Sequence, residues 1–191
     1  MGTETAKRSR KPRADSIRNR ELLLEAAAHV FSAGGPQASL EAVARQAGVG
    51  IGTLYRHFPT REVLFDAVYR HEVDQLAELA DRLAQDTLPV EALRTWLQAN
   101  VRLVATKKGM VEALQLAVHG SAELKAYSFG RLTGAIGLLL GRGVAAGELR
   151  SDIAPEDLLR TLIGIFYAQG TADWQPTALR MVDVFVNGLR R

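Results

Sequence analysis

The sequence predicts an all-α protein, because apolar residues recur at helical spacing along the chain and no segment has the pattern of a strand. No run in which Val, Ile, Thr or aromatic residues alternate with polar ones reaches strand length. The 191 residues are 47% hydrophobic and 24% charged, which is close to the composition of globular proteins and excludes wholesale disorder. We expect about nine helices in two domains.

The first expected helix precedes a clear breaking signal. Leu23, Ala27 and Phe31 recur on one helical face, and the Gly-Gly-Pro run at 34–36 ends the helix. This spacing predicts that the helix packs against its neighbours through one apolar stripe.

The second and third expected helices are short. Ser39 is a suitable N-cap for the second, and Gly48 stands where a residue with positive φ would end it. The third is expected over residues 50–58, with Leu54 and Phe58 facing the core. This order of helix, tight turn and helix is typical of a helix-turn-helix, whose second helix enters the DNA major groove.

The outer side of the third expected helix carries groups that bind nucleic acids. The residues that point away from the expected core are Thr53, Tyr55, Arg56 and His57. Hydroxyl, phenol, guanidinium and imidazole groups hydrogen-bond to phosphates and base edges, and no acidic residue interrupts them. An ordinary helical hairpin with a polar outer face is the alternative.

The N-terminal segment is strongly basic. The formal net charge is +3, from 24 basic and 21 acidic residues, and the basic excess lies in the first 20 residues. The basic residues there are Lys7, Arg8, Arg10, Lys11, Arg13, Arg18 and Arg20. Such an arm before a folded domain is typical of a protein that binds a polyanion, and some arms reach the minor groove of DNA. A disordered solubilising tail is the alternative.

Six longer helices are expected after the third. Their approximate starts are residues 60, 89, 110, 122, 155 and 176. A threonine or a proline, both typical of helix starts, stands at four of these positions. Two GxxxG spacings, Gly130–Gly134 and Gly137–Gly141, predict close helix contacts in the long helix that begins near residue 122. The change from short to long amphipathic helices predicts a domain boundary near residue 60.

Several chemistries are excluded or lack support. The chain has no cysteine, which excludes disulfides, thiolate metal sites and a cysteine nucleophile. The four histidines are scattered, and no HExxH, GxxxxGK[ST] or GxSxG motif is present. We therefore expect no enzyme activity, no cofactor and no metal site.

The hydropathy pattern does not predict a membrane protein. The longest apolar run, Leu132–Gly141, is far shorter than the ~20 residues that span a bilayer. No signal peptide is visible at the basic, polar N-terminus. We expect a cytoplasmic, nucleoid-associated protein with no membrane partner.

Two parts of the sequence are similar to a known family. From about Arg20 to Val68 the chain resembles the DNA-binding domain of the TetR/AcrR family of bacterial transcription regulators, through LLLEAAAHVFSAGG and SLEAVARQAGVGIGTLYRHFPTREVLFDAV. The stretch TLYRHFPTRE is among the most specific signatures of that family. The stretches ATKKGMVEAL and RLTGAIGLLLGRGVAAGELRSDIAPEDLL resemble the SbtR-type C-terminal domain of some members.

The resemblance implies a homodimer that represses transcription. Residues 1–15 would be a basic flexible arm, and residues 16–60 a three-helix helix-turn-helix domain that binds double-stranded DNA at a near-palindromic operator. Residues 61–191 would be a six-helix domain that dimerises and holds a small-molecule effector, whose binding releases the operator. Two recognition helices about 34–36 Å apart would enter successive major grooves.

The resemblance also assigns DNA contacts to individual residues. It places Ser39, Tyr55, His57 and Arg61 at phosphates, and Gly50, Ile51 and Thr53 at bases. Many members carry serine or threonine where this chain has Gly50, which supplies no side-chain contact. Ile51 offers an apolar surface suited to a thymine methyl group. Specificity is therefore expected to depend on Thr53, Arg56 and the arm.

Two further sets of candidates lie in the C-terminal domain. The candidates for an effector pocket are Trp96, Asn100, Met110, Leu114, His119, Tyr127 and Arg131. The candidates for a dimer interface on the last two helices are Leu158, Leu162, Ile165, Phe166, Val182, Phe185 and Leu189. Two helices from each subunit would form an isologous four-helix bundle. For both sets, internal core is the alternative.

Two other functions remain as alternatives. One is an enzyme whose catalytic groups are distant in sequence. The other is a helical protein-interaction module whose basic arm binds RNA or a membrane. Tight, palindrome-dependent binding of duplex DNA would exclude both.

Overall fold

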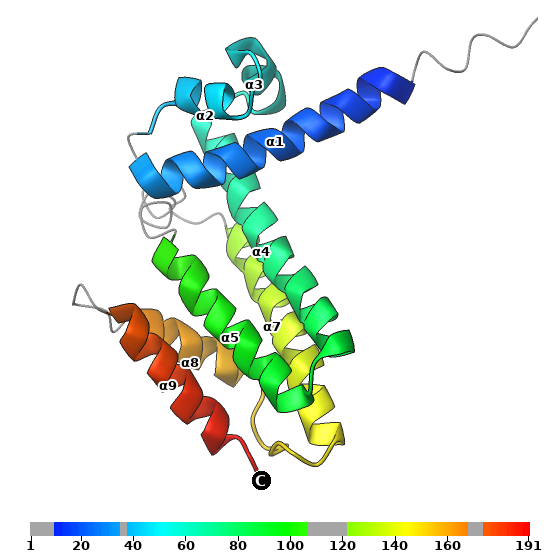
Figure 1. Cartoon of the computed structure of the whole chain (residues 1–191), viewed down its shortest axis with the longest axis vertical. Helices are drawn as coiled ribbons and strands as arrows, with labels where there is room; N and C mark the ends of the chain where they lie inside the picture. The colour runs from blue at the N-terminus through cyan, green and yellow to red at the C-terminus, as the bar shows by residue number, and fades with distance from the viewer. Residues whose placement is uncertain (1–9, 35–37, 107–121, 168–173) are drawn as a thin grey trace, which may run out of the picture. The chain divides into compact units, whose positions relative to one another are not determined.

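The computed structural model describes residues 10–34, 38–106, 122–167 and 174–191, which form eight helices (Figure 1). The helices are α1 (Arg10–Gly34), α2 (Leu40–Gln46), α3 (Ile51–His57), α4 (Arg61–Asp86), α5 (Pro89–Thr106), α7 (Ala122–Ala145), α8 (Pro155–Tyr167) and α9 (Trp174–Gly188). An isolated bridge pairs Leu149 with Arg190, and the described residues contain no strand. The all-α prediction is confirmed. The helix predicted to start near residue 110 lies outside the described residues.

The chain divides into two compact units, and the boundary between them lies within α4, between Tyr69 and Arg70. The first unit contains α1, α2, α3 and the first part of α4, and the second contains the rest of α4 with α5, α7, α8 and α9. The backbone of α4 is one continuous helix across this boundary. In the described part of the chain, no helix is both long and apolar enough to cross a membrane.

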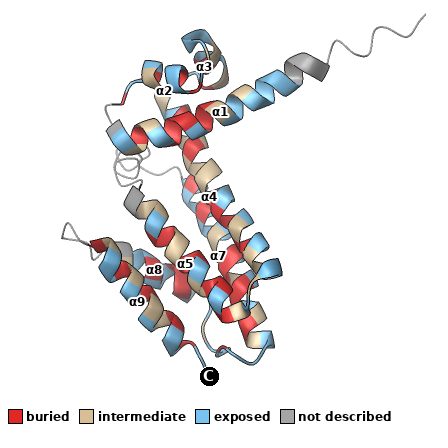
Figure 2. Cartoon of the chain, in the orientation of Figure 1, coloured by how far each residue is buried: buried red, intermediate tan, exposed pale blue. Residues whose placement is uncertain are grey.

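All four helices contribute to the core of the first unit (Figure 2). Its fully buried side chains include Leu23 and Phe31 of α1, Val43 of α2, Leu54 of α3 and Phe65 of α4. The rings of Phe31 and Phe65 stack with their centroids 4.2 Å apart. The apolar face predicted for the first helix is therefore confirmed.

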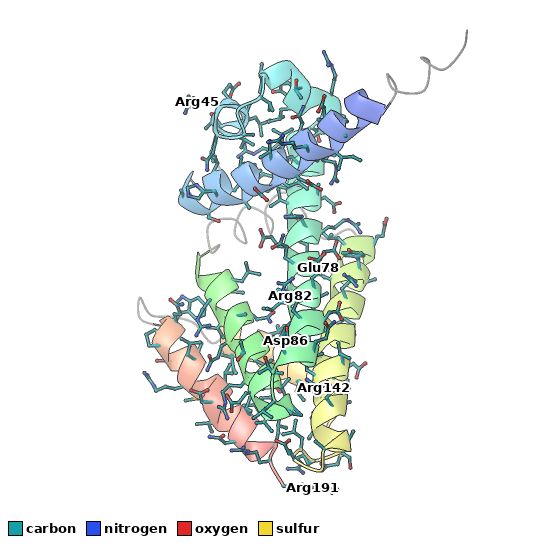
Figure 3. The ribbon with its side chains drawn as sticks, turned by 45° about the vertical axis from the view of Figure 1, so that its right-hand side comes forward. Arg45, Glu78, Arg82, Asp86, Arg142 and Arg191 are labelled. Atoms are coloured by element: carbon teal, nitrogen blue, oxygen red, sulfur yellow. The ribbon has the colours of Figure 1, made fainter. Side chains whose placement is uncertain are left out.

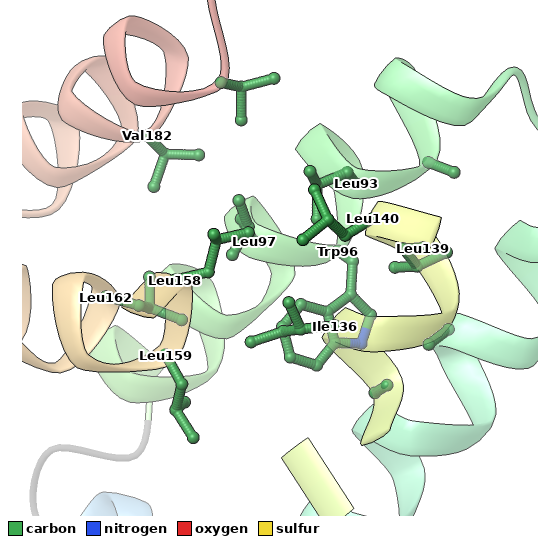
Figure 4. Close-up of a cluster of buried hydrophobic side chains, with 14 of the residues drawn as sticks. Leu93, Trp96, Leu97, Ile136, Leu139, Leu140, Leu158, Leu159, Leu162 and Val182 are labelled. Carbon is green, nitrogen blue, oxygen red and sulfur yellow. The ribbon is translucent and has the colours of Figure 1, made fainter. Parts of the chain in front are cut away.

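Helices α5, α7, α8 and α9 meet in the core of the second unit (Figure 4). The labelled side chains of that core are Leu93, Trp96 and Leu97 of α5, Ile136, Leu139 and Leu140 of α7, Leu158, Leu159 and Leu162 of α8, and Val182 of α9. Removing this apolar surface from water is the main favourable contribution to folding of the unit.

Two arginines connect helices at the margins of this core. The guanidinium of Arg94 on α5 donates a 2.9 Å hydrogen bond to Asp183 on α9. Arg142 on α7 donates to the carbonyl oxygens of Leu83 (3.4 Å) and Thr87 (3.2 Å), at the end of α4 (Figure 3). The last turn of α4 has no basic residue of its own, so Arg142 supplies the positive charge that complements a helix C-terminus.

Most helix starts agree with the predictions. Thr60, Pro89 and Pro155 stand at or directly before the first residues of α4, α5 and α8. Helix α9 begins at Trp174, two residues before the predicted start at Pro176. Pro176 is the third residue of α9, where a backbone N–H has no acceptor within the helix, so its missing N–H costs no hydrogen bond.

Helix α1 begins within the segment that was predicted to be a flexible arm. It starts at Arg10, so residues 10–15 of the expected flexible arm are helical. Pro12 is the third residue of the helix, a position where proline is tolerated.

The closest glycine contact of α7 involves Gly143, which is not one of the predicted GxxxG glycines. Of those four, Gly137 faces α8, where a Cβ atom would lie 3.5 Å from the Pro155 side chain. A Cβ atom at Gly143 would overlap the side chain of Leu149, which follows the turn at the end of α7. At Gly130, Gly134 and Gly141 a Cβ would meet no atom within 4 Å. The prediction of close helix contact at these three glycines is therefore wrong within the protomer.

Candidate nucleic-acid interface

The turn between α2 and α3 is built as the sequence predicts. The Ser39 hydroxyl accepts a 3.1 Å hydrogen bond from the backbone N–H of Ala42, which caps α2. Gly48 has a φ of 68°, a conformation that glycine adopts without steric cost. The N–H of Val49 then bonds to the carbonyl oxygen of Ala44 at 3.0 Å. One side-chain cap and one glycine thus fix the angle at which α3 leaves α2.

Helix α3 turns one side to the core and the other to solvent. Leu54 and Phe58, the residue that follows the helix, are buried. Ile51 and Tyr55 are 38% and 46% exposed, and Arg56 is also exposed. In a helix-turn-helix, residues on the exposed side of the second helix reach the base edges. The exposed side of α3 therefore offers an apolar group, a phenol and a guanidinium to such a partner.

The other predicted contacts on α2 and α3 lie in the same unit. Ser39 and Gly50 are exposed, and Thr53 and His57 are half-buried. Gly50 is the N-cap residue of α3 and provides no side-chain hydrogen bond there. No base contact through a Gly50 side chain is possible, which agrees with the sequence analysis.

Arg61, at the start of α4, rests on two aromatic rings. Its guanidinium carbon lies 5.3 Å from the ring centroid of Phe31 and 5.1 Å from that of Phe65. These cation–π contacts restrict the side chain before any ligand binds. A restricted side chain loses less conformational entropy when it binds a phosphate.

Arg20 on α1 makes a cation–π contact with a third aromatic ring of this core. Its guanidinium carbon lies 5.5 Å from the ring centroid of Phe58, and the His57 ring lies 6.2 Å from the same ring. Arg20 was predicted to belong to the basic N-terminal segment and to the start of the DNA-binding domain, and no contact with the core was predicted for it. Its spacing of three and four residues from Leu23 and Leu24 could have indicated that it shares their helical face.

The first turn of α4 is fixed by a side-chain cap. The backbone N–H of Val63 donates to the Thr60 hydroxyl at 3.3 Å. A hydrogen bond from the backbone N–H of Glu62, helped by the Thr60 hydroxyl, lowers the pKa of the Glu62 carboxyl. An ionised carboxylate in this turn complements the positive end of the helix. The cap determines where α4 starts and so where Arg61 stands.

Comparison with known proteins agrees with this geometry. Residues 23–68 match the family described as "Bacterial regulatory proteins, tetR family". Residues 88–191, more than half of the chain, match the family described as "Transcriptional regulator SbtR-like, C-terminal domain". The chain belongs to the TetR family. Both resemblances stated in the sequence analysis are therefore confirmed.

Individual TetR-family proteins show the extent of the similarity. The crystal structure of TetR transcriptional regulator SCO0520 from Streptomyces coelicolor is 40% identical, covers 90% of this chain and 98% of that one, and has a TM-score of 0.78. The TetR transcription regulatory protein from Mycobacterium vanbaalenii is 32% identical, with coverages of 94% and 99% and a TM-score of 0.78.

The curated relatives match over a shorter region. The HTH-type transcriptional regulator SAR0097 of Staphylococcus aureus is 34% identical over 84 residues, which are 42% of this chain and 44% of that protein. This chain therefore spans less than half the length of that relative.

Two of the predicted effector-pocket residues lie in the core. Trp96 is fully buried, and its indole N–H donates a 2.8 Å hydrogen bond to the carbonyl oxygen of Leu76. Asn100 is buried, and its amide donates at 2.9 Å to the carbonyl oxygen of Trp96, one turn earlier. Both side chains are thus buried and hydrogen-bonded within one chain, and their part in an effector pocket stays a prediction. The candidates that lie outside the described residues are Met110, Leu114 and His119.

The other two pocket candidates, Tyr127 and Arg131, join α7 to α4. The Tyr127 hydroxyl and the Arg131 Nε donate to the same oxygen of Asp74, at 2.6 and 2.9 Å. The hydrogen bond to Asp74 raises the pKa of Tyr127. The guanidinium of Arg70 lies 4.7 Å from the Tyr127 ring centroid and 3.5 Å from a Glu123 oxygen. These five residues, here called the Asp74 cluster, connect two helices of the second unit.

The structure corrects the predicted dimer interface. Four of its residues are buried in the core of a single chain: Leu158, Leu162, Val182 and Leu189. Ile165 and Phe185 are partly buried and pack against the same core, and the Phe166 side chain lies outside the described part of the chain. The buried four therefore have almost no surface left for a partner subunit.

The opposite faces of the last two helices carry exposed apolar side chains. Ile163 of α8 is 37% exposed, and Met181 and Val184 of α9 are 47% and 66% exposed. The sequence analysis did not name these residues, because the wider apolar stripes of α8 and α9 are on the faces that fill the core.

Proposed function

We propose that this chain is a sequence-specific transcriptional repressor that binds a near-palindromic DNA operator as a homodimer. The proposal includes release from the operator by a small-molecule effector. The observation that supports it most strongly is the exposed side of α3, where Ile51, Tyr55 and Arg56 project from a helix fixed by a capped tight turn. A helix so presented has the form that reads base edges in the major groove.

In this proposal two groups of residues contact DNA in different ways. Ser39, Tyr55, His57 and Arg61 bind phosphates, which position the protein without reading sequence. Thr53 and Arg56 read base edges, and Ile51 contacts a thymine methyl group. The main chain at Gly50 can approach the DNA closely, because no side chain stands there.

A palindromic operator requires two copies of the reading helix. Two-fold symmetry presents two α3 helices about 34–36 Å apart, one turn of DNA. We assign the subunit contact to the outward faces of α8 and α9, through Ile163, Met181 and Val184, since these faces are apolar and exposed. Such a contact would be isologous, with the same surface used by both subunits.

Release by an effector follows from linkage. An effector that binds better to a conformation with a different spacing of the α3 helices lowers the affinity for the operator by the same factor. Helix α4 is the element that would transmit the change, because it runs without a break from Arg61 to Asp86 and belongs to both units. Effector binding is assigned to the second unit.

The proposal is tested by selecting bound sequences from random DNA duplexes with the purified full chain. We expect one palindromic consensus, a complex of two chains per duplex, and binding that weakens as salt rises. Failure to enrich any sequence, or equal binding of single-stranded RNA or lipid vesicles, would overturn the proposal in favour of an interaction module.

A matched pair of variants makes the test specific. Arg56→Ala should reduce the preference for the selected operator over random duplex by about 1–3 kcal/mol per half-site, because Arg56 is exposed on the reading side of α3. Arg82→Ala removes an exposed arginine from the second unit (Figure 3) and should leave binding unchanged. Equal effects of the two substitutions would show that binding depends on charge alone.

A further inference from the structure

Helix α1 begins well before the region that matches the family of DNA-binding domains. The family match begins at Leu23, which is also the first fully buried residue of α1, whereas the helix begins at Arg10. Residues 14–21 are exposed apart from Asn19, which is half-buried (Figure 2). In Figure 1 this part of α1 projects past α2 and α3. We call residues 14–21 the α1 extension.

The extension is part of a basic stretch of the chain. Between residues 10 and 22 the sequence has five Lys or Arg residues and two acidic residues, a net charge of +3. The described arginines of the extension are Arg18 and Arg20, and both are exposed. The excess comes from Arg10, Lys11 and Arg13, since residues 14–21 carry two arginines and two acidic residues. A basic stretch of sequence next to an exposed helix is complementary to a polyanion such as DNA.

Arg20 places this charge next to the reading helix. Its guanidinium lies over the ring of Phe58, the residue directly after α3, while Phe58 itself is 1% exposed. The extension therefore leaves the domain at the C-terminal end of α3. Because the extension is helical, its direction is fixed by the packing of the α1 residues that follow it. A flexible arm would have no fixed direction.

The helical form determines which part of DNA the extension can reach. A helix with its side chains is about 10–12 Å across, whereas the minor groove of B-DNA is about 6 Å wide. The helical extension is therefore too wide to enter the minor groove, whereas a flexible arm is narrow enough to do so. Arginines on a helix beside the groove can instead reach phosphates, which carry no sequence information.

We propose that the α1 extension is an auxiliary DNA contact that binds backbone phosphates beside the site read by α3, through Arg18 and Arg20. This inference rests on the proposed function. A helix rises about 1.5 Å per residue, so the ten residues from Arg20 back to Arg10 reach about 15 Å. That length equals about four base pairs of DNA at ~3.4 Å each. The extension thus lengthens the contacted DNA without adding sequence preference.

The test compares two lengths of duplex. The selected operator is prepared flush and with about eight base pairs of arbitrary sequence added at each end, and affinities are measured from 50 to 200 mM salt. We expect the wild-type chain to bind the flanked duplex more tightly and with a steeper salt dependence. Each lost phosphate contact lowers the slope of log affinity against log salt concentration by about 0.9. Over this fourfold salt range, the affinity then changes by about threefold less.

Four variants of the full chain complete the experiment. Arg18→Ala and Arg20→Ala should each remove one contact per subunit, and so two from the dimer. The salt slope should then fall by about 1.8, which is about tenfold less change in affinity over this salt range, on the flanked duplex only. Arg20→Lys keeps the charge and should resemble the wild type, as should Arg82→Ala, which removes an exposed arginine of the second unit. Arg20 also covers the Phe58 ring, so its removal can lower the melting temperature. If it does, the result for the exposed Arg18→Ala decides.

The possible results separate the two proposals. If the wild type binds the operator but added flanks have no effect, or both alanine variants match the wild type at every salt concentration, the auxiliary contact is refuted. A flank effect that depends on flank sequence would also refute it, because phosphates carry no sequence. If the wild type binds no duplex at all, the proposed function itself fails.

Discussion

The indole N–H of Trp96, on α5, donates a 2.8 Å hydrogen bond to the backbone carbonyl oxygen of Leu76, on α4. Both residues are buried in the core of the second unit. A carbonyl oxygen has two lone pairs, so Leu76 can accept this bond and the bond of its own helix. The contact fixes the register of α5 against α4 and provides the buried N–H with a partner.

We expect Trp96→Phe to lower the free energy of unfolding by about 1–3 kcal/mol. The substitution removes one buried hydrogen bond and leaves a cavity where the larger indole packed. Urea unfolding followed by circular dichroism measures the change. Leu88→Ala, at a residue that is 73% exposed, is the control and should stay within about 0.5 kcal/mol of the wild type. A variant as stable as the wild type would contradict this role of Trp96.

Thr53→Ala should reduce affinity mainly for the selected operator. If the hydroxyl of this half-buried residue on α3 reads a base edge, its loss costs about 1–3 kcal/mol on the operator and little on random duplex. Competition binding with both duplexes measures the two affinities. Thr95→Ala, an exposed threonine of α5, serves as the control. Equal losses on both duplexes would place Thr53 among the phosphate contacts.

Arg61→Ala should weaken all duplexes alike and lower the salt slope of binding by about one unit for each bound subunit. The side chain also covers the rings of Phe31 and Phe65, so we expect a loss of stability of about 0.5–1 kcal/mol as well. Arg61→Lys keeps a charge for the phosphate and should restore most of the salt slope. A salt slope unchanged in Arg61→Ala would exclude a phosphate contact at this residue.

The sequence predicts the local structure of the first unit well, because the determinants there are local. Ser39 and Thr60 cap helices through hydrogen bonds that span three residues, and Gly48 adopts the positive φ that its position requires. Leu54 and Phe58 are buried as their spacing predicts. Each of these features depends on residues that are close in the chain, so one sequence is enough to find them.

The candidate sites of the second unit could not be predicted in the same way. Helical periodicity shows that Trp96, Leu158 and Val182 share apolar faces with their neighbours, but not what covers those faces. The same chain covers them, as the alternative in the sequence analysis held. Tyr127 and Arg131 meet Asp74 more than fifty residues away, a pairing that no local pattern contains.

The ion pair of Arg150 and Asp152 should make stability depend on pH in the acid range. Arg150 donates two hydrogen bonds of 2.6 Å to the carboxylate, which lowers the pKa of Asp152 from 3.8 to about 2. A pKa lowered by folding gives stability that is complete above about pH 4 and is lost as the pH falls towards 2.

Asp152→Asn should therefore flatten the loss of stability between about pH 4 and pH 2. The urea midpoint, measured at intervals across this range, reports the effect. In an Arg150→Met background the same substitution should change nothing further, since the partner is already gone. If wild type and Asp152→Asn lose stability in parallel over this range, the pair has no thermodynamic effect.

The Asp74 cluster supplies the last prediction, which concerns how α7 is held on α4. Asp74→Ala leaves the Tyr127 hydroxyl and the Arg131 guanidinium without their shared acceptor, and Tyr127→Phe removes one of those two donors. Because these groups are partly exposed, water can replace the lost bonds, and we expect a coupling energy of about 0.5–1.5 kcal/mol from the double-mutant cycle. Urea unfolding of the four proteins measures it. If the two effects simply add, the 2.6 Å hydrogen bond contributes nothing to holding the helices together, whereas a positive coupling makes Asp74 the residue that fixes α7 on α4.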